Sequence, residues 1–206
     1  MQRKRWWIGC LAAVGVLAIV VTAAAQTPRP TTMSFRKGST VNLFTGAAAD
    51  TSRTGLIGGG AVGWELTPRF AVEGSGEWTE WGTGSRGFAA ALTAMTGIAG
   101  SRTFMPFVTG GVGLYRASFG RLGADMPGFY VRRMTDMPPI ARTAAFTDPS
   151  VVFGGGVNAF VNRHWAVRPD IREMLVFRDS RSRLVTTIAV HVAYHFEDHP
   201  ITPRVR

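Results

Sequence analysis

The stretch LVTTIAVHVAYHF, residues 184 to 196, decides the fold class of this chain. On one set of alternate positions it carries Leu184, Ile188 and other apolar residues up to Phe196, whereas the positions between them are smaller or polar and include His191. Side chains alternate between the two faces of a β-strand, so this spacing predicts a strand with one strongly apolar face. Its thirteen residues are enough to cross the hydrocarbon layer of a membrane as a tilted strand.

Segments with the same alternation recur from residue 40 onward. We predict eight strands, near residues 40–48, 56–66, 69–81, 88–98, 104–118, 151–161, 164–177 and 184–196. Short turns at one end should alternate with longer loops at the other, the loops being 49–55, 82–87, 119–150 and 178–183. An even number of long strands joined in this way is typical of outer-membrane barrels. The sequence therefore predicts an all-β, eight-stranded antiparallel up-and-down transmembrane barrel with both termini in the periplasm.

The apolar face of each predicted strand should point toward lipid. The opposite faces carry charges mixed with alanine and glycine, which suits a narrow polar lumen. Aromatic residues fall at two levels, as expected of interfacial girdles. One level holds Trp64, Phe70, Phe104, Phe160, Trp165, Tyr194 and Phe196; the other holds Trp78, Trp81, Phe88, Tyr115, Phe119, Phe153 and Phe177. Phe44, near the middle of the first strand, does not fit either level.

Charged side chains on the inward faces predict a polar network inside the barrel. An eight-stranded barrel is barely wide enough for side chains to fill, so we expect paired charges that plug it rather than an open pore. The expected members are Glu73, Glu77, Arg168, Asp170, Arg172 and His191.

Three stretches give the chain a resemblance to a known family: PFVTGGVGLYRA from Pro106, FGGGVNAFVNRHWAVRPDIREM from Phe153, and IAVHVAYHF ending at Phe196. With them, the chain from Thr40 onward resembles the eight-stranded outer-membrane β-barrel superfamily, which includes OmpA-like, OmpX-like and porin-like barrels. The resemblance implies a closing strand read by the barrel-insertion machinery, with a signal formed by Val190, Val192, Tyr194 and Phe196. Here ten residues follow the final Phe, whereas members that are only a barrel usually stop there.

The first 25 residues predict a Sec-type export signal. Arg3, Lys4 and Arg5 precede an apolar run that ends in a small-residue cleavage pattern before Gln26. An uncleaved membrane anchor is the alternative, because the run is long enough to span a bilayer. We therefore divide the chain into a signal peptide (1–25), a periplasmic segment (26–39), the barrel (40–196) and a periplasmic tail (197–206). The single cysteine, Cys10, lies in the signal, so the rest of the chain has no thiol chemistry.

The longer loops are expected to face outward from a Gram-negative bacterium and to supply its contacts. Arg178, Arg181 and Arg183 crowd the last loop, where guanidinium groups can bind phosphates of lipopolysaccharide. The segment 119–150 is interpreted as a mobile extracellular loop, with a protein contact as the second interpretation. The net charge is +10, or +7 without the signal, but no nucleic-acid-binding motif accompanies it, so we predict no nucleic-acid partner.

We predict a structural or surface-interaction protein without catalytic residues, cofactor or metal. The glycine runs match no phosphate-binding motif, and His191 and His195 would lie about 13 Å apart on one strand, too far to share a metal. The main alternative is an outer-membrane lipid-modifying enzyme acting on lipid A or phospholipid, with Ser75, His191 and a glutamate as a hydrolase constellation. Further alternatives are a small pore and a soluble periplasmic barrel with an apolar interior.

Overall fold

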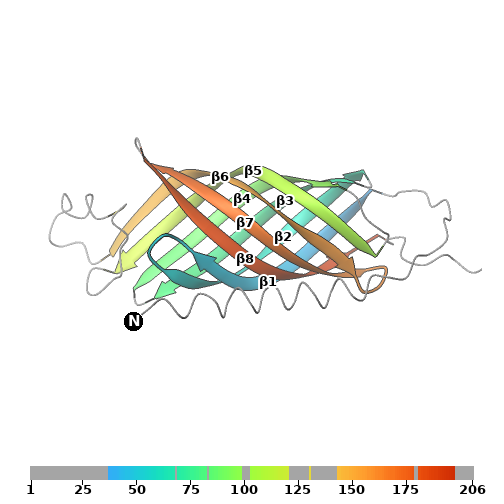
Figure 1. The fold of residues 1–206 in the computed structure, drawn as a ribbon, viewed down its shortest axis with the longest axis horizontal. Coiled ribbons are helices and arrows are strands. Elements are labelled where there is room, and N and C mark those ends of the chain that lie inside the picture. The colour runs from blue at the N-terminus through green and yellow to red at the C-terminus, as the bar shows by residue number, and fades with distance from the viewer. Residues whose placement is uncertain are drawn as a thin grey trace, which may run out of the picture.

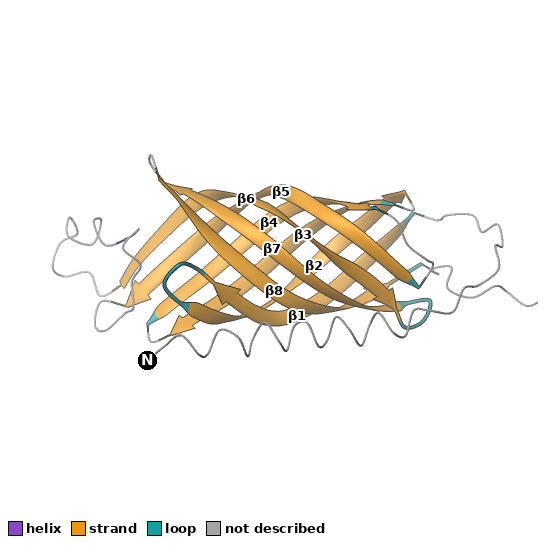
Figure 2. Ribbon diagram, viewed as in Figure 1, coloured by secondary structure: helices purple, strands orange, loops and turns teal. Residues whose placement is uncertain are grey.

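A computed structural model describes residues 37–67, 69–82, 84–98, 103–120, 130, 143–178 and 181–197, and these form a closed barrel. The predicted eight-stranded antiparallel barrel is confirmed (Figures 1 and 2). Its strands are β1 (Gly38–Ala49), β2 (Thr54–Thr67), β3 (Phe70–Gly82), β4 (Ser85–Gly97), β5 (Phe104–Gly120), β6 (Thr143–Phe160), β7 (Trp165–Arg178) and β8 (Arg181–His195). The predicted export signal lies outside the described residues. No helix in the described part of the chain is long and apolar enough to span a membrane.

Each strand pairs antiparallel with its neighbours in the sequence, and β1 closes the barrel against β8, with Thr40 opposite His195. The barrel therefore has two distinct ends. We call the end with the β1–β2, β3–β4, β5–β6 and β7–β8 connections the loop end. The opposite end, where β1 begins and β8 ends, is the turn end. There Asn162 shapes the β6–β7 turn, since its Oδ1 accepts hydrogen bonds from the backbone N–H of His164 and of Trp165, both at 2.9 Å.

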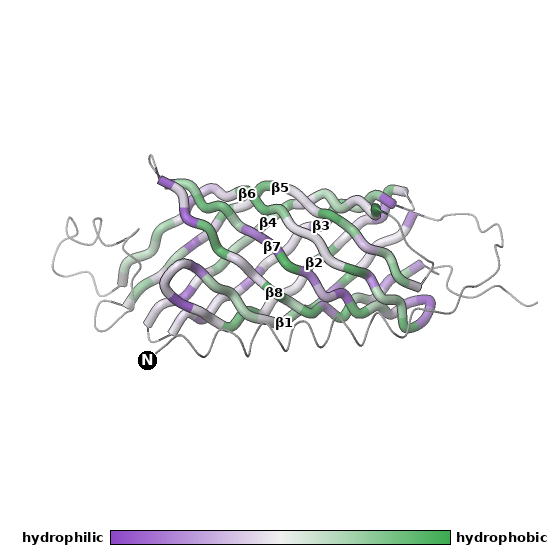
Figure 3. The backbone as a smooth tube through the Cα atoms, in the orientation of Figure 1, coloured by the Kyte–Doolittle hydropathy of each residue, from purple (hydrophilic) through white to green (hydrophobic). Residues whose placement is uncertain are grey.

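The apolar faces of the strands point out of the barrel, as predicted. Residues such as Leu43, Val112 and Val192 are half or more exposed, whereas their inward neighbours are buried. Figure 3 shows polar and apolar residues alternating along the strands. A soluble barrel with an apolar interior would not expose so many large apolar side chains on its outer face, so this arrangement disfavours that alternative and suits a surrounding hydrocarbon layer.

The sixth strand begins earlier than the sequence suggested. β6 starts at Thr143, not near residue 151, and its first eight residues pair with Gly113–Gly120 of β5. Pro149 is typical of a loop, but here it lies in the strand opposite Leu114, with its ring on the exposed outward face. The predicted loop 119–150 is correspondingly shorter. The predicted loop 82–87 also shrinks to a turn, with positive φ at Gly82 and Gly84.

Four aromatic residues assigned to the girdles point inward instead. Trp81, Tyr115 and Phe119 are buried near the loop end, and Phe160 is buried near the turn end. Their height along the strand matches a girdle, but the alternation of side chains puts all four on the inner face. The outward aromatic residues that remain are exposed, among them Trp64, Phe70, Trp165, Trp78, Phe88, Phe153 and Phe177.

Glycines on the inner face allow the strands to approach closely. A Cβ added to Gly46, on β1, would lie 2.0 Å from the carbonyl oxygen of Ile188, and one added to Gly111, on β5, would lie 2.1 Å from that of Leu92. Neither position tolerates a side chain without a backbone shift. These glycines therefore allow the sharp coiling that closes a narrow barrel.

Candidate functional site in the barrel lumen

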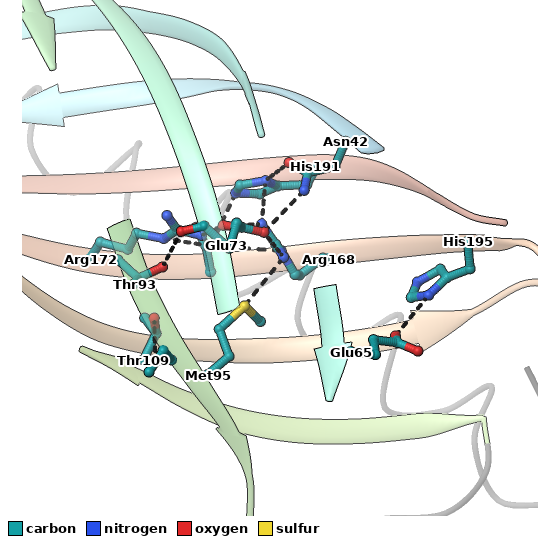
Figure 4. Close-up of polar contacts among 12 residues, drawn as sticks. Asn42, Glu65, Glu73, Thr93, Met95, Thr109, Arg168, Arg172, His191 and His195 are labelled. Atoms are coloured by element: carbon teal, nitrogen blue, oxygen red, sulfur yellow. Dashed lines mark hydrogen bonds and ion pairs between the residues drawn. The ribbon is translucent and has the colours of Figure 1, made fainter. Parts of the chain in front are cut away.

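A buried polar network crosses the middle of the barrel (Figure 4). We define the lumen network as Asn42, Glu73, Arg168, Asp170, Arg172 and His191. These residues come from β1, β3, β7 and β8, and strand alternation turns each of them inward. All six are less than a tenth exposed.

Glu73 is the acceptor at the centre of the lumen network. Arg168 donates to both of its oxygens, from Nη1 to Oε2 at 2.7 Å and from Nη2 to Oε1 at 3.1 Å. Arg172 Nη2 donates to Oε1 at 3.0 Å, and Asn42 Nδ2 donates to Oε2 at 3.1 Å. β3 and β7 are four strands apart in a barrel of eight, so the Glu73–Arg168 pair joins opposite walls.

Asp170 and His191 form the second half of the lumen network. Arg172 Nε donates to Asp170 Oδ2 at 3.0 Å, and His191 Nε2 lies 3.0 Å from the same oxygen. The register places Arg168 directly opposite His191 on neighbouring strands, and Arg168 Nη2 lies 2.9 Å from His191 Nδ1. Charged groups buried in this way need ionic and hydrogen-bonded partners, and these side chains supply most of them to one another. Among the described residues, Arg168 Nε and Asp170 Oδ1 have no hydrogen-bond partner.

The structure brings together five of the six residues predicted for the lumen. The sixth, Glu77, lies four residues after Glu73 on β3. Its carboxylate accepts a hydrogen bond from Thr79 Oγ1 at 3.5 Å. It lies on the same face as Glu73 but further toward the loop end.

Sequence reasoning missed two residues of this site, both on β1. The residues predicted for the lumen do not include Asn42, and Phe44 fits neither aromatic level. Phe44 is buried in the lumen with its ring centroid 4.5 Å from that of His191. Alternation along residues 40–48 would have placed both side chains on the inner face together with Thr40, but the first strand has few large residues to define its faces.

A second buried cluster closes the loop end. We define the loop-end cluster as Asp50, Arg53, Trp81, Ser85, Tyr115 and Arg183. Asp50 binds Arg53 Nε at 3.2 Å and makes a short contact with Arg183, while Arg53 Nη1 donates to Ser85 Oγ at 2.6 Å. Both guanidiniums lie over the Trp81 ring, and Trp81 Nε1 donates to the Tyr115 hydroxyl at 2.8 Å.

Tyr130 packs next to this cluster. Its side chain is fully buried and stacks on Phe146, with ring centroids 5.3 Å apart. The Arg178 guanidinium lies 5.1 Å from the Tyr130 ring and binds Asp148 at 2.7 Å. Burial raises the pKa of the Tyr130 hydroxyl above its ordinary value, with Arg183 acting in the opposite direction, so this side chain stays neutral.

Two of the three arginines expected to bind lipopolysaccharide make ion pairs within the barrel instead. Arg183 and Arg178 turn into the barrel mouth, where Asp50 and Asp148 pair with them. Arg181 is the exposed member of the three. The physical reason is again alternation, because residues 178 and 183 fall on the inner faces of β7 and β8.

The proposed insertion signal lies on the outer surface of β8. Val190 and Val192 are 39% and 50% exposed, and Phe196, just after the strand, is 56% exposed. Tyr194 contacts Trp165 and Phe196 edge to ring, with centroids 5.0 and 5.2 Å apart. The four side chains thus form one accessible apolar row.

Asp50, in the β1–β2 connection, links stability to pH. Burial raises the pKa of this carboxyl. The hydrogen bond from Ser52 N–H and the charge of Arg183 lower it by more, so the pKa of Asp50 lies below its ordinary value. A lowered pKa means that the ionised carboxylate stabilises the fold at neutral pH and that this contribution is lost as the pH falls through the folded-state pKa.

Asp50→Asn is therefore expected to lower the free energy of unfolding at pH 7, with the difference from wild type shrinking as the pH drops below about 4. Urea unfolding of the refolded barrel across this pH range measures the effect. A gap that stays constant with pH would show that the charge of Asp50 is not what stabilises the loop end.

Comparisons with known proteins identify the fold. No protein-family model matches the chain, and no curated protein matches its sequence. Among solved structures, the Neisserial surface protein A aligns with a TM-score of 0.57 at 11% identity, covering 78% of this chain and 97% of that one. Ail, the attachment invasion locus protein of Yersinia pestis, in complex with the heparin analogue sucrose octasulfate, aligns with a TM-score of 0.52 at 11% identity over 79% of this chain and all of Ail. The N-terminal β-barrel domain of Pseudomonas aeruginosa OprF aligns with a TM-score of 0.50 at 13% identity over 78% of this chain and all of that domain.

Proposed function

Since the chain is an eight-stranded β-barrel with the fold of outer-membrane proteins, we propose that it is a bacterial outer-membrane protein with a structural or surface-interaction role and a lumen closed by its own side chains. The observation that carries this proposal is the Glu73–Arg168 pair, which joins opposite walls of the barrel. The loop-end cluster adds a second closure nearer the mouth. Two layers of paired charges across the lumen favour this proposal over a small pore.

Wild-type protein in planar bilayers is therefore expected to show no stepwise ion conductance above the lipid baseline at neutral pH. Single-channel recording checks this directly. The matched comparison is a variant in which Glu73, Arg168, Asp170 and Arg172 are all serine, which removes the bridge together with two charges of each sign. Regular conductance steps from the wild-type protein would contradict the closed lumen.

A role without catalysis is part of the proposal. His191, the histidine of the alternative hydrolase constellation, has Asp170 at Nε2 and both Arg168 and Asn42 at Nδ1. A general base needs a free ring nitrogen directed at a nucleophile, and these contacts use both nitrogens. Mass spectrometry of lipid A and phospholipids from cells with and without the protein is expected to show identical species. An acyl change that requires Ser75 or His191 would establish the enzyme alternative instead.

The proposed location follows from the apolar outer face and the export signal. Membrane fractionation should recover the protein with the outer membrane, and N-terminal sequencing should begin at Gln26. The loop end would then face outward, with exposed Arg181 available to lipopolysaccharide phosphates and the β5–β6 connection available to an extracellular protein. Protease treatment of intact cells tests this orientation, since cleavage restricted to the turn end would reverse it.

A further inference from the structure

His191 Nδ1 lies between two groups that make opposite demands on it. Arg168 Nη2, which can only donate a hydrogen bond, lies 2.9 Å away. Asn42 Oδ1, which can only accept one, lies 3.0 Å away. A bare Nδ1 satisfies the arginine and leaves the amide oxygen without this donor, whereas a protonated Nδ1 does the reverse.

Rotating the Asn42 amide does not remove this conflict. Its Nδ2 donates to Glu73 Oε2 at 3.1 Å, so exchanging the amide oxygen and nitrogen would place an oxygen against a carboxylate. Glu73 therefore fixes the amide with its oxygen toward His191. Arg168 is held in turn by two other hydrogen bonds to Glu73.

Charged and polar groups from three strands surround His191. The groups that face it are Asp170, Arg168 and Arg172 from β7, Glu73 and Glu77 from β3, and Asn42 and Phe44 from β1. Asp170 at Nε2 and the Phe44 ring, whose centroid lies 4.5 Å from that of the imidazole, favour a cation there, whereas the two guanidiniums oppose it.

We propose that His191 is a proton-binding site in the lumen, and that a proton on Nδ1 replaces the hydrogen bond from Arg168 with one to Asn42. In the neutral form Nε2–H faces Asp170 and Nδ1 accepts from Arg168. In the cation both N–H groups have acceptors, Asp170 and Asn42, and Arg168 keeps its two hydrogen bonds to Glu73. The proton comes from solvent and no covalent bond other than N–H changes.

This inference rests on the proposed closed lumen, because protonation of His191 gives the bridge between opposite walls two arrangements. Arg168 is tied to both Glu73 and His191 in the first arrangement. It is tied to Glu73 in the second, and its Nη2 is released from β8.

Nitrogen NMR of the full barrel, with histidine and arginine side chains labelled with ¹⁵N, tests the proposal between pH 4 and 8. His191 Nδ1 is expected to pass from the unprotonated to the protonated position as the pH falls, and the Arg168 guanidinium signal should move with the same midpoint. His191→Gln should abolish the Arg168 step. His195→Gln, which removes the other inward histidine of β8, should leave it in place.

Asn42→Ala provides a second, milder variant if His191→Gln does not fold. Loss of the acceptor for Nδ1–H should move the His191 step to lower pH. A His191 signal that stays in one protonation state, an Arg168 signal that does not follow it, or a midpoint unchanged in Asn42→Ala would each overturn the proposal. A conducting wild-type lumen would contradict the proposed function without altering the titration, so the two failures are distinguishable.

Discussion

Replacing Glu73 with alanine is expected to lower the free energy of unfolding of the barrel by about 3–5 kcal/mol. Glu73 accepts hydrogen bonds from Arg168, Arg172 and Asn42 in a fully buried site. The alanine variant keeps both guanidiniums in the lumen without their shared carboxylate, and an uncompensated buried charge is far more costly than the loss of a good contact. Urea unfolding in a lipid or detergent environment, followed by the gel mobility of the folded barrel, measures the change.

Glu80→Ala on the same strand is the matched control. Glu80 also pairs with an arginine, Arg86, at 3.3 Å, but these side chains are 46% and 61% exposed. An exposed ion pair contributes about 0–1 kcal/mol, so this variant should unfold close to wild type. Equal effects of the two substitutions would show that burial and the position across the lumen do not determine the strength of the Glu73 interactions.

Adding a single methyl group to Gly111 is expected to destabilise the barrel by about 3 kcal/mol, the upper part of the range for overpacking. The new Cβ would lie 2.1 Å from the carbonyl oxygen of Leu92 and 2.6 Å from Thr93 Cα, both of them backbone atoms of β4. Side-chain rotation relieves neither contact, so the β4–β5 ladder has to shift. Refolding yield and the urea midpoint of Gly111→Ala measure this effect.

Gly74→Ala makes the same chemical change on the outer face. No atom of the described residues lies within 4 Å of the added Cβ at Gly74. The variant is expected to be within about 1 kcal/mol of wild type and somewhat more stable, because alanine has less freedom than glycine in the unfolded chain. If Gly74→Ala is as damaging as Gly111→Ala, the glycines serve the strand conformation itself rather than the close approach of neighbouring strands.

The sequence was sufficient to predict the barrel because its strands repeat a strong alternation. Residues 184–196 separate apolar from small or polar positions so clearly that strand type, length and outward face follow from them. The start of β6 is harder to predict from sequence, because Asp148 and Pro149 are typical of loops. Asp148 lies on the inner face and Pro149 on the outer face only once β6 is paired with its neighbouring strands.

The candidate site was partly predictable for the same reason. Charged residues at alternate positions of β3 and β7 had to share the inner side, so Glu73 and Arg168 could be expected together. Side-chain contacts such as the Asn42 amide between Glu73 and His191 depend on exact register, which alternation does not supply. The inward turn of Arg183 and the burial of Tyr130 likewise depend on the closed shape of the loop end.

The chain order of the lumen network bears on how the barrel is assembled. Glu73 is on the third strand, but the guanidiniums that pair with it are both on the seventh, 95 and 99 residues later. A chain arrested after six strands would hold a carboxylate with neither of these cations, and the network gains its full stabilisation once β7 and β8 have joined β1. The interior of this protein thus stabilises the completed barrel selectively, and truncated forms that lack the last two strands should be recognised as unfinished by proteases.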